Sequence, residues 1–231
     1  MNGDESIVRR GLQKGTDLYV QDISYRDALQ AAAYKGHLSI VRILLENATG
    51  ISPRSDHYDA SARRGQYGNA LLAAASEGHM DVVKFLLDNG ADIHGQSKFG
   101  SPLLVAAHFG HREIVREFFE TGADPDASLY DVQTPLSLAA YCGQDEVVKL
   151  LLESGAKVDT KNIEGETPLS LASREGHTDV VKVLLEGWCR RALHEKLWSD
   201  TILWQARDRG HEEVARVLLD DDTTWVLIVG N

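Results

Sequence analysis

Apolar residues recur along this chain in pairs that lie four positions apart, with a glycine and a polar stretch between one group and the next. Val82-Val83 with Leu86-Leu87 shows the pattern, and Val147-Val148 with Leu151-Leu152 repeats it. Apolar pairs with this spacing form one face of an α-helix. The pattern therefore predicts a series of short amphipathic helices. They are expected within residues 40–45, 82–87, 114–119, 147–152, 180–185 and 214–219.

A Gly-His or Gly-Gln dipeptide precedes each of these segments. The glycines are 42, 32, 33, 33 and 34 residues apart, at Gly36, Gly78, Gly110, Gly143, Gly176 and Gly210. Ahead of each glycine lies a shorter apolar segment, often rich in alanine, such as 70–75. Small side chains there allow two helices to approach closely. Each repeat is thus a helix pair that cannot bury its apolar stripe alone, so neighbouring pairs must stack.

The residues at the segment ends agree with this interpretation. Thr134-Pro135 and Thr167-Pro168 predict helix starts, with threonine as the cap and proline in the first turn,. Gly155 predicts a helix end, because glycine readily adopts the left-handed conformation found there,. The stretches that follow such glycines, for example 93–99, are expected to form protruding hairpin loops.

With a period near 33 and these Thr-Pro-Leu and Gly-His motifs, the chain resembles the ankyrin-repeat family over roughly residues 7–220,. The resemblance implies an all-α ankyrin-repeat solenoid of stacked helix-turn-helix units with protruding hairpin loops. It also implies that the repeat histidines bond to the backbone of the adjoining loop. Residues 68–71 and 27–32 resemble variants found in filamentous-fungal ankyrin arrays.

The repeat register divides the chain into three parts. Residues 1–24 match the second helix and loop of a half repeat, which is either a natural cap or a start within a longer array. Residues 25–187 hold five repeats, with a loop insertion at about 48–66 that either is a tolerated surface loop or folds over the groove. Residues 188–231 form a degenerate capping repeat and tail. This last part contains all four tryptophans, which are expected to close the stack,.

Charge and composition restrict the classes of partner that the chain is expected to bind. The formal net charge of −11 argues against nucleic acid and anionic membranes, which attract clustered Lys and Arg,. Apolar runs such as Val226–Val229 are far too short to span a bilayer, and the first ten residues lack the apolar core of a signal peptide,. The two cysteines, 47 residues apart, are expected to be reduced,. These features predict an intracellular protein, cytoplasmic or nuclear.

The resemblance implies that a partner protein or peptide binds in the concave groove, against the hairpins and the ends of the first helices. Aromatic residues are expected toward the middle of this groove and charged residues toward its C-terminal end, unless the rings pack on neighbouring loops instead. The candidate contact residues are Tyr25, Tyr34, Lys35, Tyr67, Ser76, Glu77, Phe99, His108, Phe109, Gln133, Tyr141, Cys142, Glu166, Arg174 and Glu175.

The alternative is a small-molecule-binding or catalytic ankyrin protein of the isomerase or cyclase type. An apolar small molecule would bind the aromatic groove beneath the 48–66 loop. His108 and Tyr141 would then be the acid-base candidates, with Glu77 or Cys142 assisting,. The sequence contains no phosphate-binding glycine loop, zinc-ligand spacing or recognisable catalytic motif. We therefore expect no cofactor and no metal.

Overall fold

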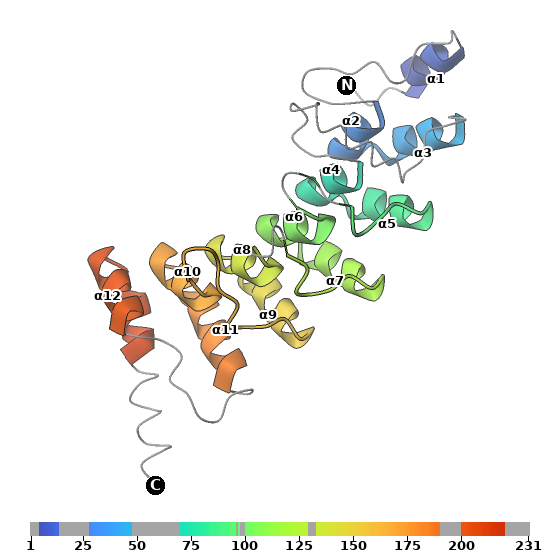
Figure 1. Ribbon diagram of the computed structural model, residues 1–231. Helices are drawn as coiled ribbons and strands as arrows, with labels where there is room; N and C mark the ends of the chain where they lie inside the picture. The colour runs from blue at the N-terminus through green and yellow to red at the C-terminus, as the bar shows by residue number, and fades with distance from the viewer. Residues whose placement is uncertain are drawn as a thin grey trace. The chain divides into compact units, whose positions relative to one another are not determined.

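The chain is helical throughout the parts that the computed structural model describes, which are residues 5–13, 28–47, 70–95, 97, 100–128, 133–189 and 200–219. No β-strand occurs within these ranges, so the all-α expectation is confirmed for them. Residues 212–219 are also helical. The other helices are α1 (Glu5–Gln13), α2 (Ala28–Tyr34), α3 (Leu38–Asn47), α4 (Ala70–Glu77), α5 (Met80–Asp88), α6 (Pro102–Phe109), α7 (Arg112–Glu120), α8 (Pro135–Tyr141), α9 (Asp145–Glu153), α10 (Pro168–Glu175), α11 (Thr178–Cys189) and α12 (Asp200–Asp208) (Figure 1).

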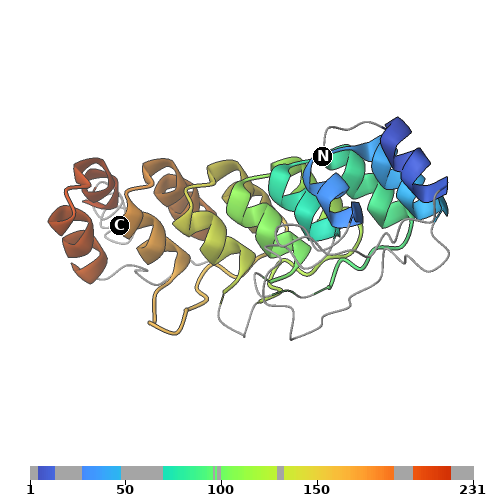
Figure 2. The ribbon, with the colours of Figure 1, turned by 90° about the horizontal axis from the view of Figure 1, so that it is seen from above.

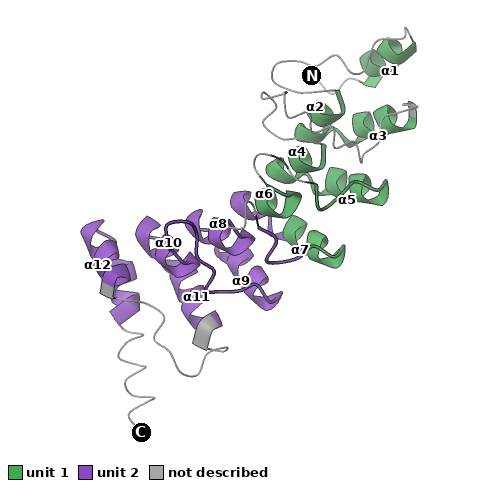
Figure 3. Cartoon of the chain, in the orientation of Figure 1, with its two compact units in different colours: residues 1–106, 113–123 green, residues 107–112, 124–231 purple. Residues whose placement is uncertain are grey.

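These helices fall into two compact units (Figure 3). Unit 1 comprises Met1–Ala106 and Glu113–Ala123, and unit 2 comprises Ala107–Arg112 and Asp124–Asn231. Most of α7 belongs to unit 1, whereas the last turn of α6 belongs to unit 2.

Unit 1 is built from helix pairs in which each first helix packs on its own second helix and on the next first helix. Helix α2 contacts α3 and α4, α4 contacts α5, and α3 contacts α5. Helix α1 lies against α3 (Figures 1 and 2). The first helices therefore form one layer of the unit and the second helices the other.

Unit 2 repeats this arrangement. Helices α8, α10 and α12 form a row of first helices, and α9 and α11 form a row of second helices behind it (Figure 2). Neighbouring first helices approach closely because they carry small buried residues. Ala139, Ala140, Ala172 and Ser173 are completely buried, and Leu151 of the second row is buried with them,. Alanine and serine at these positions are therefore the sequence feature that sets the spacing between repeats.

The Thr-Pro motifs begin helices as expected. The Thr134 hydroxyl accepts a hydrogen bond from the Ser137 amide at 3.1 Å, and the Thr134 amide donates to the Ser137 hydroxyl at 3.0 Å. Thr167 and Ser170 form the same reciprocal pair at the start of α10. These bonds satisfy amides that have no partner within the helix.

Helix α11 departs from the expected loop start at Trp188, because it continues to Cys189. Gly187 lies inside this helix, where an added Cβ would be 2.7 Å from Leu152 Cδ1. Its lack of a side chain lets α11 approach α9 closely, and the helix continues past it.

Several sequence predictions fall outside the described residues. They include the 48–66 insertion, Trp198 and Trp225, and the Trp188 side chain is not described either. Trp204 is described, and 65% of its surface is exposed. Among the described residues, no helix is both long enough and apolar enough to cross a membrane.

Candidate functional site

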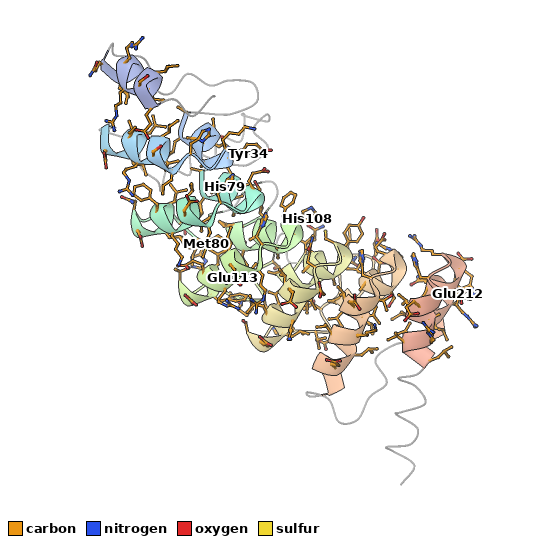
Figure 4. The ribbon with its side chains drawn as sticks, turned by 180° about the vertical axis from the view of Figure 1, so that it is seen from behind. Tyr34, His79, Met80, His108, Glu113 and Glu212 are labelled. Atoms are coloured by element: carbon orange, nitrogen blue, oxygen red, sulfur yellow. The ribbon has the colours of Figure 1, made fainter. Side chains whose placement is uncertain are left out.

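The repeat histidines hold the ends of the first helices in place. In unit 2, His177 Nε2 donates to the Tyr141 carbonyl at 2.9 Å. In unit 1, His79 Nε2 donates to the Tyr34 carbonyl at 3.1 Å, and Figure 4 shows the two residues side by side. The last carbonyls of a helix lack partners within it, so a donor from the next repeat satisfies them. The expected backbone bond is present, but its acceptor is the preceding first helix rather than the adjoining loop.

Each of these histidine rings also lies over the repeat glycine of the preceding repeat. A Cβ on Gly143 would be 2.6 Å from His177 Nδ1, and one on Gly176 would be 2.5 Å from His211 Nδ1. Gln144 takes the histidine position in its repeat, where its Nε2 donates to the His108 carbonyl at 3.3 Å. Glycine is therefore needed at these positions for two reasons. The side chain from the next repeat leaves no room for a Cβ, and the backbone has a positive φ.

The residues fixed in this way form one surface of unit 2, which we call the unit 2 face. It consists of the two residues that precede the repeat glycine at the C-terminal ends of α6, α8 and α10. Phe109 and Tyr141 on this face are 43% and 44% exposed. Apolar side chains exposed singly need no explanation, whereas rings exposed together on neighbouring helix ends are a candidate contact surface. The members of the face are His108, Phe109, Tyr141, Cys142, Arg174 and Glu175.

The half of the face nearest α6 is apolar and closely packed. His108 Nδ1 lies 3.2 Å from Cys142 Sγ, which joins α6 to the C-terminal end of α8. The His108 and Phe109 rings meet edge to face, with centroids 4.7 Å apart,. Burial raises the pKa of the Cys142 thiol, so the thiol stays protonated beside His108 Nδ1,.

The half nearest α10 is charged, but its charges are paired with one another. The Arg174 guanidinium bonds to Glu166, and its Nε donates to Glu175 Oε1 at 2.9 Å. Although partial burial opposes it, these two carboxylates raise the pKa of Arg174 above its ordinary value. The same guanidinium lies 5.9 Å from the centroid of the Tyr141 ring,. Arg174 therefore links the aromatic and charged halves.

Glu166 ties a hairpin to this face, and the hairpin carries an apolar residue that the sequence reasoning missed. Asn162 Oδ1 accepts from the amides of Glu164 and Glu166 at 3.0 and 2.8 Å, which fixes the turn,. Ile163 stands at the tip of this turn and is 85% exposed. The available signal was a single aliphatic residue within the polar stretch 161–166.

The remaining predicted contact residues lie in different places. In unit 1, Lys35 Nζ lies 5.2 Å from the centroid of the Tyr34 ring, and Glu77 is exposed. Ser76 was expected to line the groove, but it is buried, because its short side chain turns back to the Ala73 carbonyl at 2.9 Å. Gln133 is exposed in unit 2. Tyr25, Tyr67 and Phe99 lie outside the described residues.

The structure does not activate Cys142 as a nucleophile. His108, Tyr141 and Cys142 belong to unit 2, whereas Glu77 belongs to unit 1. A cysteine nucleophile needs a lowered pKa, and that of Cys142 is raised,. In unit 1, a hollow of about 640 Å³ lies beside Leu87, Asp92 and Thr121, away from the candidate residues of that unit. Among the described residues, no three His, Cys, Asp or Glu side chains are grouped to hold a metal.

The state of Cys142 can be tested by alkylation. In the full chain with Cys189→Ala, iodoacetamide at pH 8 is expected to label Cys142 at least about threefold more slowly than it labels the urea-unfolded chain, because only the thiolate reacts. Mass spectrometry gives both rates, and equal rates would contradict the raised pKa. Folding raises the pKa of this thiol, so the protonated thiol adds to the free energy of unfolding,. This contribution is fully present at pH values below the ordinary thiol pKa, and it is lost as the pH rises through the pKa of the folded protein.

Comparisons with known families agree with the repeat pattern. A family model of ankyrin repeats in three copies matches residues 1–97 and 71–162. A second model, of ankyrin repeats in many copies, matches residues 143–185. No curated protein shows a significant match to the chain. The matched residues include α8 and α10, which carry Tyr141 and Arg174 of the unit 2 face.

Proposed function

Because the chain belongs to the ankyrin-repeat family, whose repeats are in general protein-interaction modules, we propose that it binds a partner protein or peptide through the unit 2 face. The observation that carries this proposal is the exposure of Phe109 and Tyr141 on helix ends whose carbonyls are bonded to side chains of the following repeats. Fold and family alone name no partner, so the chemistry of this face determines which partners it can bind.

The two rings are suited to be anchors. Tyrosine and phenylalanine bury a large area with few rotatable bonds, and they are enriched at the centres of protein interfaces. The Gln144 bond holds the helix end beside Phe109, and the His177 bond holds the Tyr141 carbonyl. A partner therefore meets rings that are carried on a backbone already held in place, which lowers the entropy cost of binding.

Polar groups surround these anchors in the manner of an interface rim. Arg174 pairs with Glu166 and Glu175, and Arg209 Nη1 lies 3.8 Å from Glu175 Oε1, so two arginines balance two carboxylates beneath a partner that covers them,. Paired rim charges contribute mainly to specificity and to the rate of association. Ile163, projecting from the hairpin next to Glu166, supplies a further apolar contact. The free Cys142 thiol and the acidic net charge support an intracellular polypeptide partner, in the cytoplasm or nucleus, rather than nucleic acid or membrane,.

A random peptide display library selected on the full chain tests this proposal. Selected peptides are expected to bind the double variant Phe109→Ser, Tyr141→Ser at least about tenfold more weakly, since loss of an anchor costs more than about 1.4 kcal/mol. The matched control is Lys149→Ser, Lys182→Ser, which changes two exposed residues on second helices. Circular dichroism checks that both variants fold. Peptides that bind both variants equally would rule out the unit 2 face.

A further inference from the structure

The hollow of unit 1 lies where two second helices end. It is bordered by Leu87 in the last turn of α5, by the hairpin residues 90–94, and by Thr121, which directly follows α7. Lys84 of α5 pairs with Glu117 of α7 at 3.2 Å, so the two helices lie side by side (Figure 1). The volume of about 640 Å³ falls within the range of pockets that hold ligands,. The hollow is therefore large enough to receive a side chain from a partner.

Apart from the exposed His94 ring, the polar side chains in the lining of this hollow present hydrogen-bond acceptors. Asp92 is half-buried, and its Oδ1 accepts from the His94 amide at 2.8 Å. Within the described residues, its carboxylate has no basic partner. The Thr121 hydroxyl donates to the carbonyls of Glu117 and Phe118, both at 3.0 Å, so its oxygen can accept from an incoming donor,. A positively charged donor suits this set of groups.

Negative charge adjoins the hollow and has no basic partner among the described residues. Asp88 ends α5 and Glu120 ends α7, and each is exposed and next to a lining residue in the chain. The negative ends of the helix dipoles make a carboxylate unfavourable at these positions. Lys84 and Arg116 stand one turn earlier, but each of them pairs with another glutamate. A cation in the hollow would therefore offset a repulsion that these pairs leave in place.

We propose that this hollow binds a lysine or arginine side chain from a basic peptide segment of a partner polypeptide. Leu87, Ala91 and Ile93 provide half-buried apolar surface for the methylene groups of such a side chain, and Asp92 lies among them to meet its charged end,. An acidic or purely apolar occupant would leave the Asp92 carboxylate covered and unpaired, which is costly. The hollow lies wholly within unit 1, so it is separate from the unit 2 face.

Fluorescence anisotropy of a labelled hexalysine peptide measures binding to the full chain. The titration is made at about 150 mM sodium chloride, where charges more than about 8 Å apart are largely screened. Asp92→Asn keeps the oxygen that accepts from the His94 amide, so the hairpin is expected to stay folded. This variant is expected to bind the peptide at least about threefold more weakly, as the loss of one ion pair would cause.

The matched control is Asp179→Asn, which makes the same change of charge at an exposed residue of unit 2. Equal weakening in the two variants would show that the peptide responds only to the net charge, and would overturn the proposal. Failure of the unaltered chain to bind hexalysine would also overturn it. The variant Phe109→Ser, Tyr141→Ser is expected to bind hexalysine unchanged, so this site and the unit 2 face are tested independently.

Nuclear magnetic resonance locates the bound peptide. On addition of hexalysine, the backbone amide signals of 87–94 and 120–123 are expected to shift, whereas those of α8 and α10 stay unchanged. A peptide whose lysines are all acetylated keeps the methylene groups and loses the charge, and it is expected to cause no shift. Shifts confined to other parts of the chain, or equal shifts with the acetylated peptide, would show that the hollow does not recognise a cationic side chain.

Discussion

Replacing Leu151 with alanine is expected to lower the free energy of unfolding by about 2 to 5 kcal/mol. Leu151 lies in α9 and is completely buried. Removing its branched end leaves a cavity that the backbones on either side cannot close, because the spacing of the helices is set by buried alanine and serine at the repeat contacts. The loss therefore includes the transfer energy of the removed atoms and the cost of the cavity.

Urea denaturation followed by far-ultraviolet circular dichroism measures this effect. Lys149→Ala is the matched control, because Lys149 lies on the exposed side of the same helix and its loss is expected to change stability by less than about 0.5 kcal/mol,. The slope of the transition must also be compared, since repeat proteins can unfold in parts. A cost for Leu151→Ala as small as that of the control would mean that α9 buries another side.

The second large effect is expected at Gly143, where alanine should cost about 1.5 to 3.5 kcal/mol. Gly143 has a φ of +75°, and placing an alanine in this left-handed region costs about 1 to 2 kcal/mol,. The new Cβ would also displace the His177 ring, which lies 2.6 Å from its position. Loss of the His177 hydrogen bond to the Tyr141 carbonyl adds about 0.5 to 1.5 kcal/mol,.

Gly210→Ala is a control that separates the backbone cost from the cost of displacing the histidine ring. Gly210 occupies the same repeat position with a φ of +78°, but a Cβ there would have no atom within 4 Å. Gly210→Ala is therefore expected to show the backbone cost alone. The difference between the two variants should disappear when His177 is already replaced by alanine, which a double-mutant cycle measures. Equal costs at Gly143 and Gly210 in the unaltered background would show that the histidine ring yields without loss.

The sequence predicted the features of this chain that depend on local patterns. Thr134-Pro135 and Thr167-Pro168 begin helices because their capping bonds involve residues three positions apart. The apolar pairs from Val147 to Leu152 form a buried stripe because helical periodicity is a property of the segment itself,. Such predictions need no knowledge of the neighbouring repeats.

Features that depend on contacts between distant residues could not be predicted in the same way. The proximity of His108 to Cys142, the pairing of Arg174 with Glu166, and the burial of Ser76 follow from how one helix end faces the next. The repeat register placed Phe109 and Tyr141 among the candidate contact residues, but their exposure follows from the packing around them. Ile163 was missed because an aliphatic residue in a loop has no periodic signal.

The contact between each repeat glycine and the following histidine has a consequence for how an array of this kind changes length during evolution. A repeat such as 143–175 takes part in this contact with both of its neighbours. Gly143 lies under His177 of the following repeat, and Gln144 donates to the His108 carbonyl of the preceding repeat. Duplication or deletion of a whole repeat therefore recreates the contact between glycine and the following side chain without compensating substitutions. Gln144, standing where the neighbouring repeats have histidine, shows that the donor side tolerates replacement. We accordingly expect relatives to diverge first at the histidine positions, whereas the glycines persist in every copy that is followed by another.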